Sequence, residues 1–475
     1  MKFYHRHGGW TTRSRGPMIV GALRPESEPP VRAATFAERA SYFFLVPRLV
    51  TAFAVAVLII GRRPQSFFNP QFWAEDGPVF YGPQLVHGAA RTLFVPYAGY
   101  LQIVPRLTSV IAAHVPAQLA PVICSLVAYA IAIWACSIFV EDRFASVVRS
   151  RILRALVCCA FAAIPPAWEL LGTITNVHWY LALAALLLLI GKPRTGRQAA
   201  GNTIWSASAI ALCGLSAPET LIFAPFAIRQ FFLTRDRFAL AVPTAFLLAL
   251  CVQALELVLD PLHQAPSVHL SIDTTIFATI VAFVHRVFIT AVFGRPASMF
   301  IASHSLDGLA LLSALIFAVV AALLVQARAR TRWPVFVLLM LAIALIAVAV
   351  DGRGGVAPLF TTLAAVDSPN GERYFFLPVE AFILAAAILV DDWESPGTWA
   401  PTACFVALFL CGAIFNYRVD RLPDMHWSSY APLVDKWKAA ARHAQPSPAV
   451  SIPINPSWTF VLPEISATAP APKDR

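Results

Sequence analysis

Long apolar windows alternate with short polar segments along most of this chain. From about residue 43 to residue 415 the windows recur at roughly the 20-residue length that an α-helix needs to cross a bilayer. Only α-helices satisfy all their backbone hydrogen bonds within one such segment, so the pattern predicts membrane-spanning helices. The expected fold is an all-α, polytopic transmembrane bundle of about 11 to 13 spans, with loops and helix ends gathered at the outer face.

The same pattern divides the chain into three parts. Residues 1–42 lack an apolar run and are expected to form a flexible cytoplasmic arm, 43–415 carry the spans, and 416–475 form a short extracytoplasmic tail with a helix over about 429–443. Spans are predicted at 43–60, 107–140 (a short interfacial helix, then a helix from about 119), 155–171, 178–191, a short pair at 203–216 and 219–229, 238–258, 308–326, 334–350, 375–390 and 399–415. Outer loops are predicted at 61–104, 259–307 and 351–374, although 275–293 is apolar enough to dip into the bilayer or lie on it.

Composition and charge agree with a membrane protein. The chain has 475 residues, of which 58% are apolar and only 13% charged, whereas soluble domains run nearer a quarter charged. Its net charge of +10 is explained by basic cytoplasmic loops rather than by nucleic acid, so no nucleic-acid partner is expected. This distribution places the N-terminus in the cytoplasm and the C-terminus outside, with membrane lipids as neighbours.

Two adjacent acids stand just after the first predicted span, in Phe72-Trp73-Ala74-Glu75-Asp76-Gly77-Pro78. Carboxylates near hydrocarbon are costly and often functional, and one held there can accept a proton from an alcohol. The structural alternative is a helix start, with Asp76 as the cap and the proline in the first turn. Both roles are compatible.

Further polar and aromatic residues collect at predicted outer helix ends. Arg373 and Tyr374 begin one inward helix. The guanidinium of Arg373 could bind a phosphate group there, or it could extend to the membrane interface beside an aromatic belt. Donors and rings at other outer positions are candidates for the same site or for that belt: Asn176, His178, Trp179, Tyr100 and Arg106.

Other polar residues have different expected roles. His285 and Arg286 fall inside an apolar stretch, so this stretch is expected to line a cavity or lie at the interface. Arg62 and Arg63 are expected to contact lipid headgroups. No Cys/His cluster has structural-zinc spacing, and all eight cysteines fall in apolar stretches, which favours buried thiols over disulfides.

The arrangement of an N-terminal arm, a first span and an acid-bearing outer loop resembles the GT-C class of polytopic glycosyltransferases. The segments that carry the resemblance are Trp73-Ala74-Glu75-Asp76-Gly77, Tyr97-Ala98-Gly99-Tyr100 with Arg106, and Arg373-Tyr374-Phe375-Phe376, and they are similar to motifs of bacterial membrane proteins related to that class. The resemblance covers roughly 43–415. Family members often separate their two acids by one residue, whereas here the acids are adjacent, so the choice between Asp76 and Glu75 stays open.

The resemblance implies a bacterial cytoplasmic-membrane enzyme. It would move a sugar from a polyprenyl-phosphate donor to a glycan, lipid or protein acceptor at the outer face, with a first-loop carboxylate as general base and Arg373, with Arg106 or His178, on the phosphate. A lipid phosphate is a good leaving group, so one base and cationic stabilisation suffice, and direct attack inverts the anomeric carbon. The need for a divalent cation, Mg²⁺ or Mn²⁺, stays open.

Three alternatives remain at this point. A transporter or flippase for lipid-linked saccharides would also gather charge around a cavity, but it should have repeat symmetry and polar residues at mid-membrane depth, and the sequence shows neither clearly. An O-antigen polymerase or ligase would use a long outer loop such as 259–307. A structural membrane subunit would have no use for the outer acid and aromatic motif.

Overall fold

α-Helices dominate the chain, as the apolar pattern predicts. The computed structural model describes residues 32–192, 197–259, 271–304, 306–352, 371–392 and 399–466. Parts of several predicted features lie outside these ranges: residues 1–31 of the N-terminal arm, 260–270 and 353–370 of two outer loops, and 467–475 of the tail. The described residues from Pro47 onward form one compact unit.

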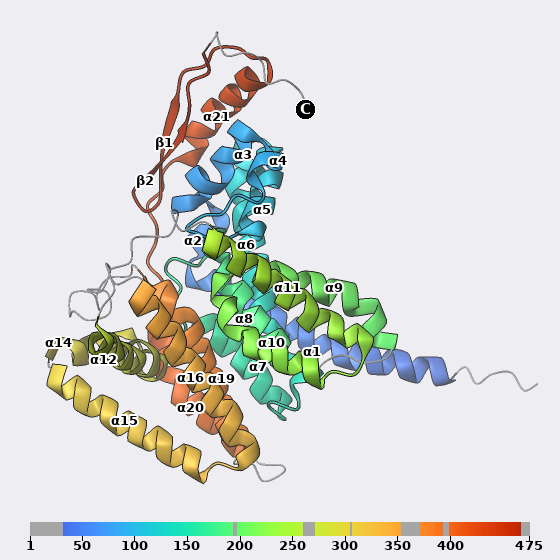
Figure 1. Cartoon of the computed structure of the whole chain (residues 1–475), viewed down its shortest axis with the longest axis vertical. Helices are drawn as coiled ribbons and strands as arrows, with labels where there is room; N and C mark the ends of the chain where they lie inside the picture. Colours follow the sequence, from blue (N-terminus) through green and yellow to red (C-terminus); the bar gives the residue numbers. More distant parts are fainter. Residues whose placement is uncertain are drawn as a thin grey trace, which may run out of the picture. The chain divides into compact units, whose positions relative to one another are not determined.

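The α-helices are, in chain order, α1 (Arg32–Arg62), α2 (Pro64–Phe68), α3 (Gly82–His87), α4 (Ala89–Thr92), α5 (Ile103–Ala113), α6 (Ala120–Ser137), α7 (Arg151–Ala163), α8 (Val177–Ile190), α9 (Arg197–Gly214), α10 (Ala224–Leu233), α11 (Arg237–Leu259), α12 (Ile272–Ala282), α13 (Thr290–Phe293), α14 (Arg295–His304), α15 (Leu306–Gln326), α16 (Ala329–Gly352), α19 (Phe376–Asp392), α20 (Ala400–Phe415) and α21 (Trp427–Arg442) (Figure 1). Two strands, β1 (Val450–Ile454) and β2 (Trp458–Leu462), pair antiparallel with Ile452 opposite Phe460.

Five helical segments among the described residues are long and apolar enough to cross a membrane. They are Ala117–Val140, Phe238–Leu259, Ile272–Phe293, Ala329–Val350 and Glu372–Asp392. A sixth candidate is the pair Asn202–Gly214 and Pro218–Leu233, which is bent by 116° at the predicted Ala217-Pro218 break. The all-α polytopic fold is therefore confirmed. The predicted total of about 11 to 13 spans stays a prediction.

Within the predicted outer segment 259–307, residues 271–304 are more helical than the sequence suggests. Ile272–Phe293 has the length and composition of a membrane span, where the sequence predicts an outer segment that dips into or lies on the bilayer. A π-helical stretch over Phe283–Ile289 joins α12 to α13 and holds the buried His285 and Arg286. Such stretches occur frequently at functional sites.

Helices α8 and α19 form the centre of the bundle. Every residue of α8 from Val177 to Leu189 is buried, and α19 is buried at nearly every position. Because these two helices are buried on nearly all sides, they are enclosed by neighbouring segments of the chain rather than by lipid. His178 and Trp179 lie in the first turn of α8, and Arg373 and Tyr374 lie in the 3₁₀ turn Glu372–Phe375 that precedes α19.

The C-terminal segment packs against the first outer loop rather than extending as a tail. Phe72 lies 4.8 Å from Trp427 and 5.0 Å from Tyr81 between ring centroids, and Tyr81 lies 5.9 Å from Phe460. Figure 1 shows β1, β2 and α21 beside α3. Helix α21 confirms the predicted 429–443 helix. The hairpin was not predicted, because prolines inside and after β1 argue against a strand.

Gly412 allows α20 to approach α13 closely. A Cβ at this position would clash with the backbone carbonyl of Ala291. We expect Gly412→Ala to destabilise the protein by about 1–3 kcal/mol, because backbone must move to admit the methyl group. Thermal unfolding of the purified chain in detergent measures the effect. Ala407→Val on the exposed face of the same helix is the matched control, and equal midpoints for both variants would contradict this packing.

Candidate functional site

A cavity of about 750 Å³ lies between the first outer loop, the 164–176 connection, the start of α19 and the C-terminal segment. Its charged lining residues are Glu75, Glu169, Arg373 and Arg421. Four aromatic side chains also line it, namely Trp73, Trp168, Tyr374 and Trp458. Segments separated by up to several hundred residues therefore build one polar and aromatic chamber.

The first outer loop presents its two acids in opposite directions. A 3₁₀ turn over Ala74–Asp76 follows Trp73, and Ala74 adopts a positive φ of 38°, a conformation that side-chain-bearing residues rarely hold. The Ala74 amide donates to the carbonyl oxygen of Asn455, which fixes this turn against the hairpin. Glu75 is half-buried and lines the cavity, whereas Asp76 is buried and does not line it.

Asp76 fastens the loop to the 164–176 connection. Its Oδ1 accepts hydrogen bonds from the amide and the hydroxyl of Thr175, and its Oδ2 accepts one from the Trp73 amide at 3.2 Å. Burial raises the pKa of this carboxyl to about 7, against the opposing effect of these hydrogen bonds. The structure therefore gives Asp76 a tethering position and leaves Glu75 as the first-loop acid that reaches the cavity.

The Tyr97-Ala98-Gly99-Tyr100 segment is a tight turn that carries two tyrosines to the site. Tyr97 and Tyr100 exchange backbone hydrogen bonds, and Ala98 and Gly99 both have positive φ, as a type I′ turn requires. The Tyr97 hydroxyl lies 3.2 Å from Glu75 Oε1, and the ring of Tyr100 lies 6.4 Å from that of His178. One turn thus connects the acid of the cavity with the outer end of α8.

Glu169 holds the predicted phosphate ligand Arg373. Its Oε1 lies 2.6 Å from Nη1 of Arg373, and its Oε2 accepts from the backbone amides of Gly371 and Arg373. Gly371 has a φ of +82°, which favours glycine and lets the chain turn into α19. Glu169 also interacts electrostatically with Glu75. Two carboxylates and one guanidinium are therefore neighbours in the cavity.

A row of aromatic contacts runs from Arg373, in the turn that precedes α19, to the first turn of α8. The guanidinium lies 5.1 Å from the ring centroid of Tyr374, which meets Trp179 edge-on at 5.8 Å, and Trp179 lies 5.0 Å from His178. His178 Nδ1 lies 3.1 Å from Glu219. These residues are brought together as predicted, but of them only Arg373 and Tyr374 line the cavity.

The side chains of Asn176 and Arg106 donate hydrogen bonds to backbone carbonyls. Asn176 donates its side-chain amide to the carbonyl of Glu169, so it braces the connection that carries that acid. Arg106 is buried, donates to the carbonyls of Val79 and Val95, and lies 5.1 Å from the ring of Phe80. Both carbonyls that Arg106 binds belong to the first outer loop, so its side chain braces that loop, and it does not line the cavity.

Several cavity residues were not chosen from the sequence. Trp168 and Glu169 fell at the end of a predicted span, while Arg421 and Trp458 fell in the predicted tail. The adjacent Pro165-Pro166 was a usable signal, because it ends α7 and leaves residues 164–176 as an irregular segment that can approach a site. Within the described residues, no three His, Cys, Asp or Glu side chains are grouped to hold a metal ion.

Replacing each of the two acids with its amide should separate their roles. Asp76→Asn places an amide donor against N–H or O–H donors, so we expect a loss of about 1–3 kcal/mol of stability. Glu75→Gln, at a half-buried position, should change stability far less. Thermal unfolding in detergent measures both. An unchanged midpoint for Asp76→Asn would contradict the tethering position.

The pH dependence of stability provides a second test of Asp76. Its pKa rises from an ordinary 3.8 to about 7 on folding, so the folded protein binds more protons than the unfolded chain in that interval. This group should therefore make the protein less stable as the pH rises from about 4 through about 7. We expect Asp76→Asn to flatten that part of the thermal unfolding profile and Glu75→Gln to retain it. Parallel profiles for wild type and Asp76→Asn would refute the assignment.

The chain matches no protein-family model, no curated protein and no solved structure in comparisons with each. The information on function therefore lies in the cavity itself. It combines a half-buried carboxylate, an ion-paired guanidinium and aromatic walls in a chamber of about 750 Å³.

Proposed function

We propose that this chain is an integral membrane glycosyltransferase. It would move a sugar from a polyprenyl-phosphate donor to an acceptor glycan, lipid or protein at the outer face of the bacterial cytoplasmic membrane. The observation that carries the proposal is that Glu75 and Arg373, which lie 298 positions apart, line one cavity. A base and a phosphate ligand in a shared chamber are what transfer from a lipid phosphate requires.

Glu75 is the proposed general base. The acceptor hydroxyl oxygen attacks the anomeric carbon of the donor sugar while its proton passes to the Glu75 carboxylate. The bond between the anomeric carbon and the phosphate oxygen breaks, and its electron pair leaves with the polyprenyl phosphate. A single displacement of this kind inverts the anomeric centre. The hydroxyl of Tyr97, 3.2 Å from Glu75 Oε1, orients the carboxylate.

Arg373 is the proposed phosphate ligand, and Glu169 is its positioning residue. A guanidinium has five N–H donors, so pairing with one carboxylate leaves it able to bind phosphate oxygens as well. The 2.6 Å contact with Glu169 and the neighbouring ring of Tyr374 restrict where that guanidinium can lie. Arg421, which lines the same cavity, adds positive charge for the departing phosphate.

The walls of the cavity suit a sugar. Trp73, Trp168 and Trp458 line it, and large amphipathic rings offer apolar faces to the C–H side of a pyranose while their edges remain polar. Glu75 and Glu169 are two carboxylates of the kind that Mg²⁺ or Mn²⁺ takes together with substrate phosphates, so these residues would hold such an ion if the reaction uses one. None of the steps above is routed through it.

Replacing the base or the phosphate ligand tests the proposal. We expect Glu75→Gln to slow transfer by about two to four orders of magnitude, because it removes the general base. We expect Arg373→Gln to slow it by about two to three orders of magnitude, because it removes a cation that stabilises the departing phosphate. Transfer of radiolabelled sugar from polyprenyl-phosphate donors is measured in membranes containing the full chain. Glu464→Gln, an exposed acid on the C-terminal segment, is the control. Full activity of stably inserted Glu75→Gln would remove its role as base.

A further inference from the structure

The C-terminal hairpin carries an exposed tryptophan to the cavity that Glu75 and Arg373 line. Trp458 is the first residue of β2, lines this cavity and is 41% exposed. The buried core of the hairpin is made by other residues of the strand, Phe460 and Leu462. The indole of Trp458 is therefore accessible to a ligand, and large rings of this kind commonly line ligand pockets.

The tip of the hairpin is bonded to the turn that carries the proposed base. The carbonyl of Asn455 accepts a hydrogen bond from the amide of Ala74, which directly precedes Glu75. The side-chain amide of Asn455 donates to the carbonyl of Pro423 at 3.0 Å. The tip, the first outer loop and the segment after α20 therefore meet beside Glu75, three residues before Trp458.

The segment after α20 is fastened along its backbone to residues 63–71. Arg63 Nε donates to the carbonyl of Asp420 at 2.9 Å, and Gln65 Nε2 donates to the carbonyl of Leu422 at 2.8 Å. Gln71 accepts from the amide of Met425 at 2.7 Å. Because these bonds are closely spaced, the cavity wall formed by residues 421–425 has a fixed course.

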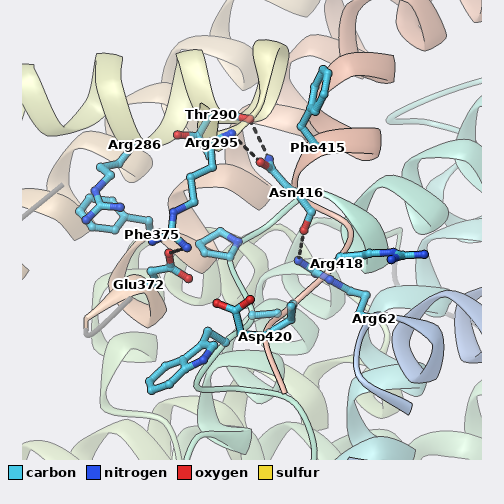
Figure 2. Close-up of a pocket in the computed structure, with 14 residues that line it drawn as sticks. Arg62, Arg286, Thr290, Arg295, Glu372, Phe375, Phe415, Asn416, Arg418 and Asp420 are labelled. Atoms are coloured by element: carbon cyan, nitrogen blue, oxygen red, sulfur yellow. Dashed lines mark hydrogen bonds and ion pairs between the residues drawn. The ribbon is translucent and has the colours of Figure 1, made fainter. Parts of the chain in front are cut away.

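The start of the same segment is fixed at Asn416. Its side-chain amide donates to the carbonyls of Thr290 at 2.8 Å and Ile164 at 3.2 Å, and its own carbonyl accepts from Arg62 at 3.0 Å. Figure 2 shows the contacts with Thr290 and Arg62. The C-terminal wall is thus anchored at its start, along its length and at the hairpin tip, so little order has to be gained when a ligand binds.

The position of Trp458 associates it with the acceptor. A general base lies within hydrogen-bond reach of the proton that it removes, so the acceptor hydroxyl is expected next to Glu75. Trp73 is closer to Glu75 in sequence, but it is only 3% exposed and packs edge-on against Trp168 at 5.0 Å. Arg373, the proposed ligand of the donor phosphate, belongs to a different wall, the turn before α19. Trp458 is therefore the accessible ring that an acceptor beside Glu75 would meet.

The chemistry of this wall suits a saccharide. An indole presents a flat apolar face to the C–H groups on one side of a pyranose, and Ser457, which also lines the cavity, can hydrogen-bond sugar hydroxyls. Helix α21 of the same segment exposes Lys436 and Arg442, as a helix in contact with water does. An acceptor that reaches Trp458 along this segment therefore arrives from water, which disfavours a lipid.

We infer that the acceptor of the proposed transferase is a saccharide whose pyranose ring stacks on Trp458 and whose attacking hydroxyl points to Glu75. This inference rests on the proposed function and narrows it, since a lipid or protein acceptor would not require an accessible indole at this position. Trp458 is a specificity-determining residue in this scheme, and the base remains Glu75.

Binding is tested with the full chain in detergent on an array of immobilised pyranose oligosaccharides and Ser/Thr-containing peptides. We expect wild type to bind at least one oligosaccharide series and Trp458→Ala to weaken that binding about tenfold. Trp458→Phe should retain most of the affinity, whereas Trp458→Leu should bind as weakly as Trp458→Ala, because it keeps an apolar side chain without the flat face. Trp205→Ala, at an exposed tryptophan outside the cavity, is the matched control.

Sugar transfer from polyprenyl-phosphate donors, measured with the same proteins, separates the inference from the proposed function. Glu75→Gln should bind oligosaccharides like wild type while transfer is lost. Transfer that depends on Glu75, together with no oligosaccharide binding, binding of peptides alone, or equal affinity of wild type and Trp458→Leu, would overturn the saccharide acceptor and leave the transferase standing. Absence of transfer by wild type would remove the proposed function and the acceptor role with it. Thermal unfolding confirms that each variant is folded, and the comparison of Trp458→Phe with Trp458→Leu suffices if Trp458→Ala does not fold.

Discussion

The Glu169 side chain is the constraint on which the rest of the site depends. It binds the Arg373 guanidinium and the amides of Gly371 and Arg373, while its own carbonyl receives hydrogen bonds from Thr173 and Asn176. These contacts fasten the irregular 164–176 connection to the start of α19. Helices α8 and α19 are enclosed on nearly all sides, so this link holds Arg373 near the end of α8 that carries His178.

Neighbouring acids with different surroundings define one side of the candidate site. Asp76 is buried and ties the first loop to Thr175, while Glu75 lines the cavity and lies within hydrogen-bond distance of Tyr97. The bonds of Asp76 thereby fix the backbone that carries Glu75. The hydrogen bond from the Ala74 amide to Asn455 holds Ala74 at its positive φ, and it fixes the same turn.

Two arginines hold the start of the C-terminal segment. Arg62 and Arg63, which the sequence led us to expect against lipid headgroups, are buried instead, and they donate to the carbonyls of residues 416, 417 and 420. The aromatic cluster around Phe72 and Phe460 secures the hairpin. The segment therefore forms one wall of the cavity that Glu75 and Arg373 line.

The sequence alone determined the fold class, the breaks near residues 115 and 217 and the acid and aromatic motifs at helix ends, because the thickness of the hydrocarbon layer sets the length of an apolar helix. It also predicted that Arg373, Tyr374, Trp179, His178 and Tyr100 gather at outer helix ends. Only the tertiary structure decided that Glu75 rather than Asp76 faces the cavity, that Arg106 braces a loop and that the C-terminal hairpin closes the chamber. These outcomes depend on contacts between residues that lie far apart in the chain, and such contacts are fixed by packing rather than by local pattern.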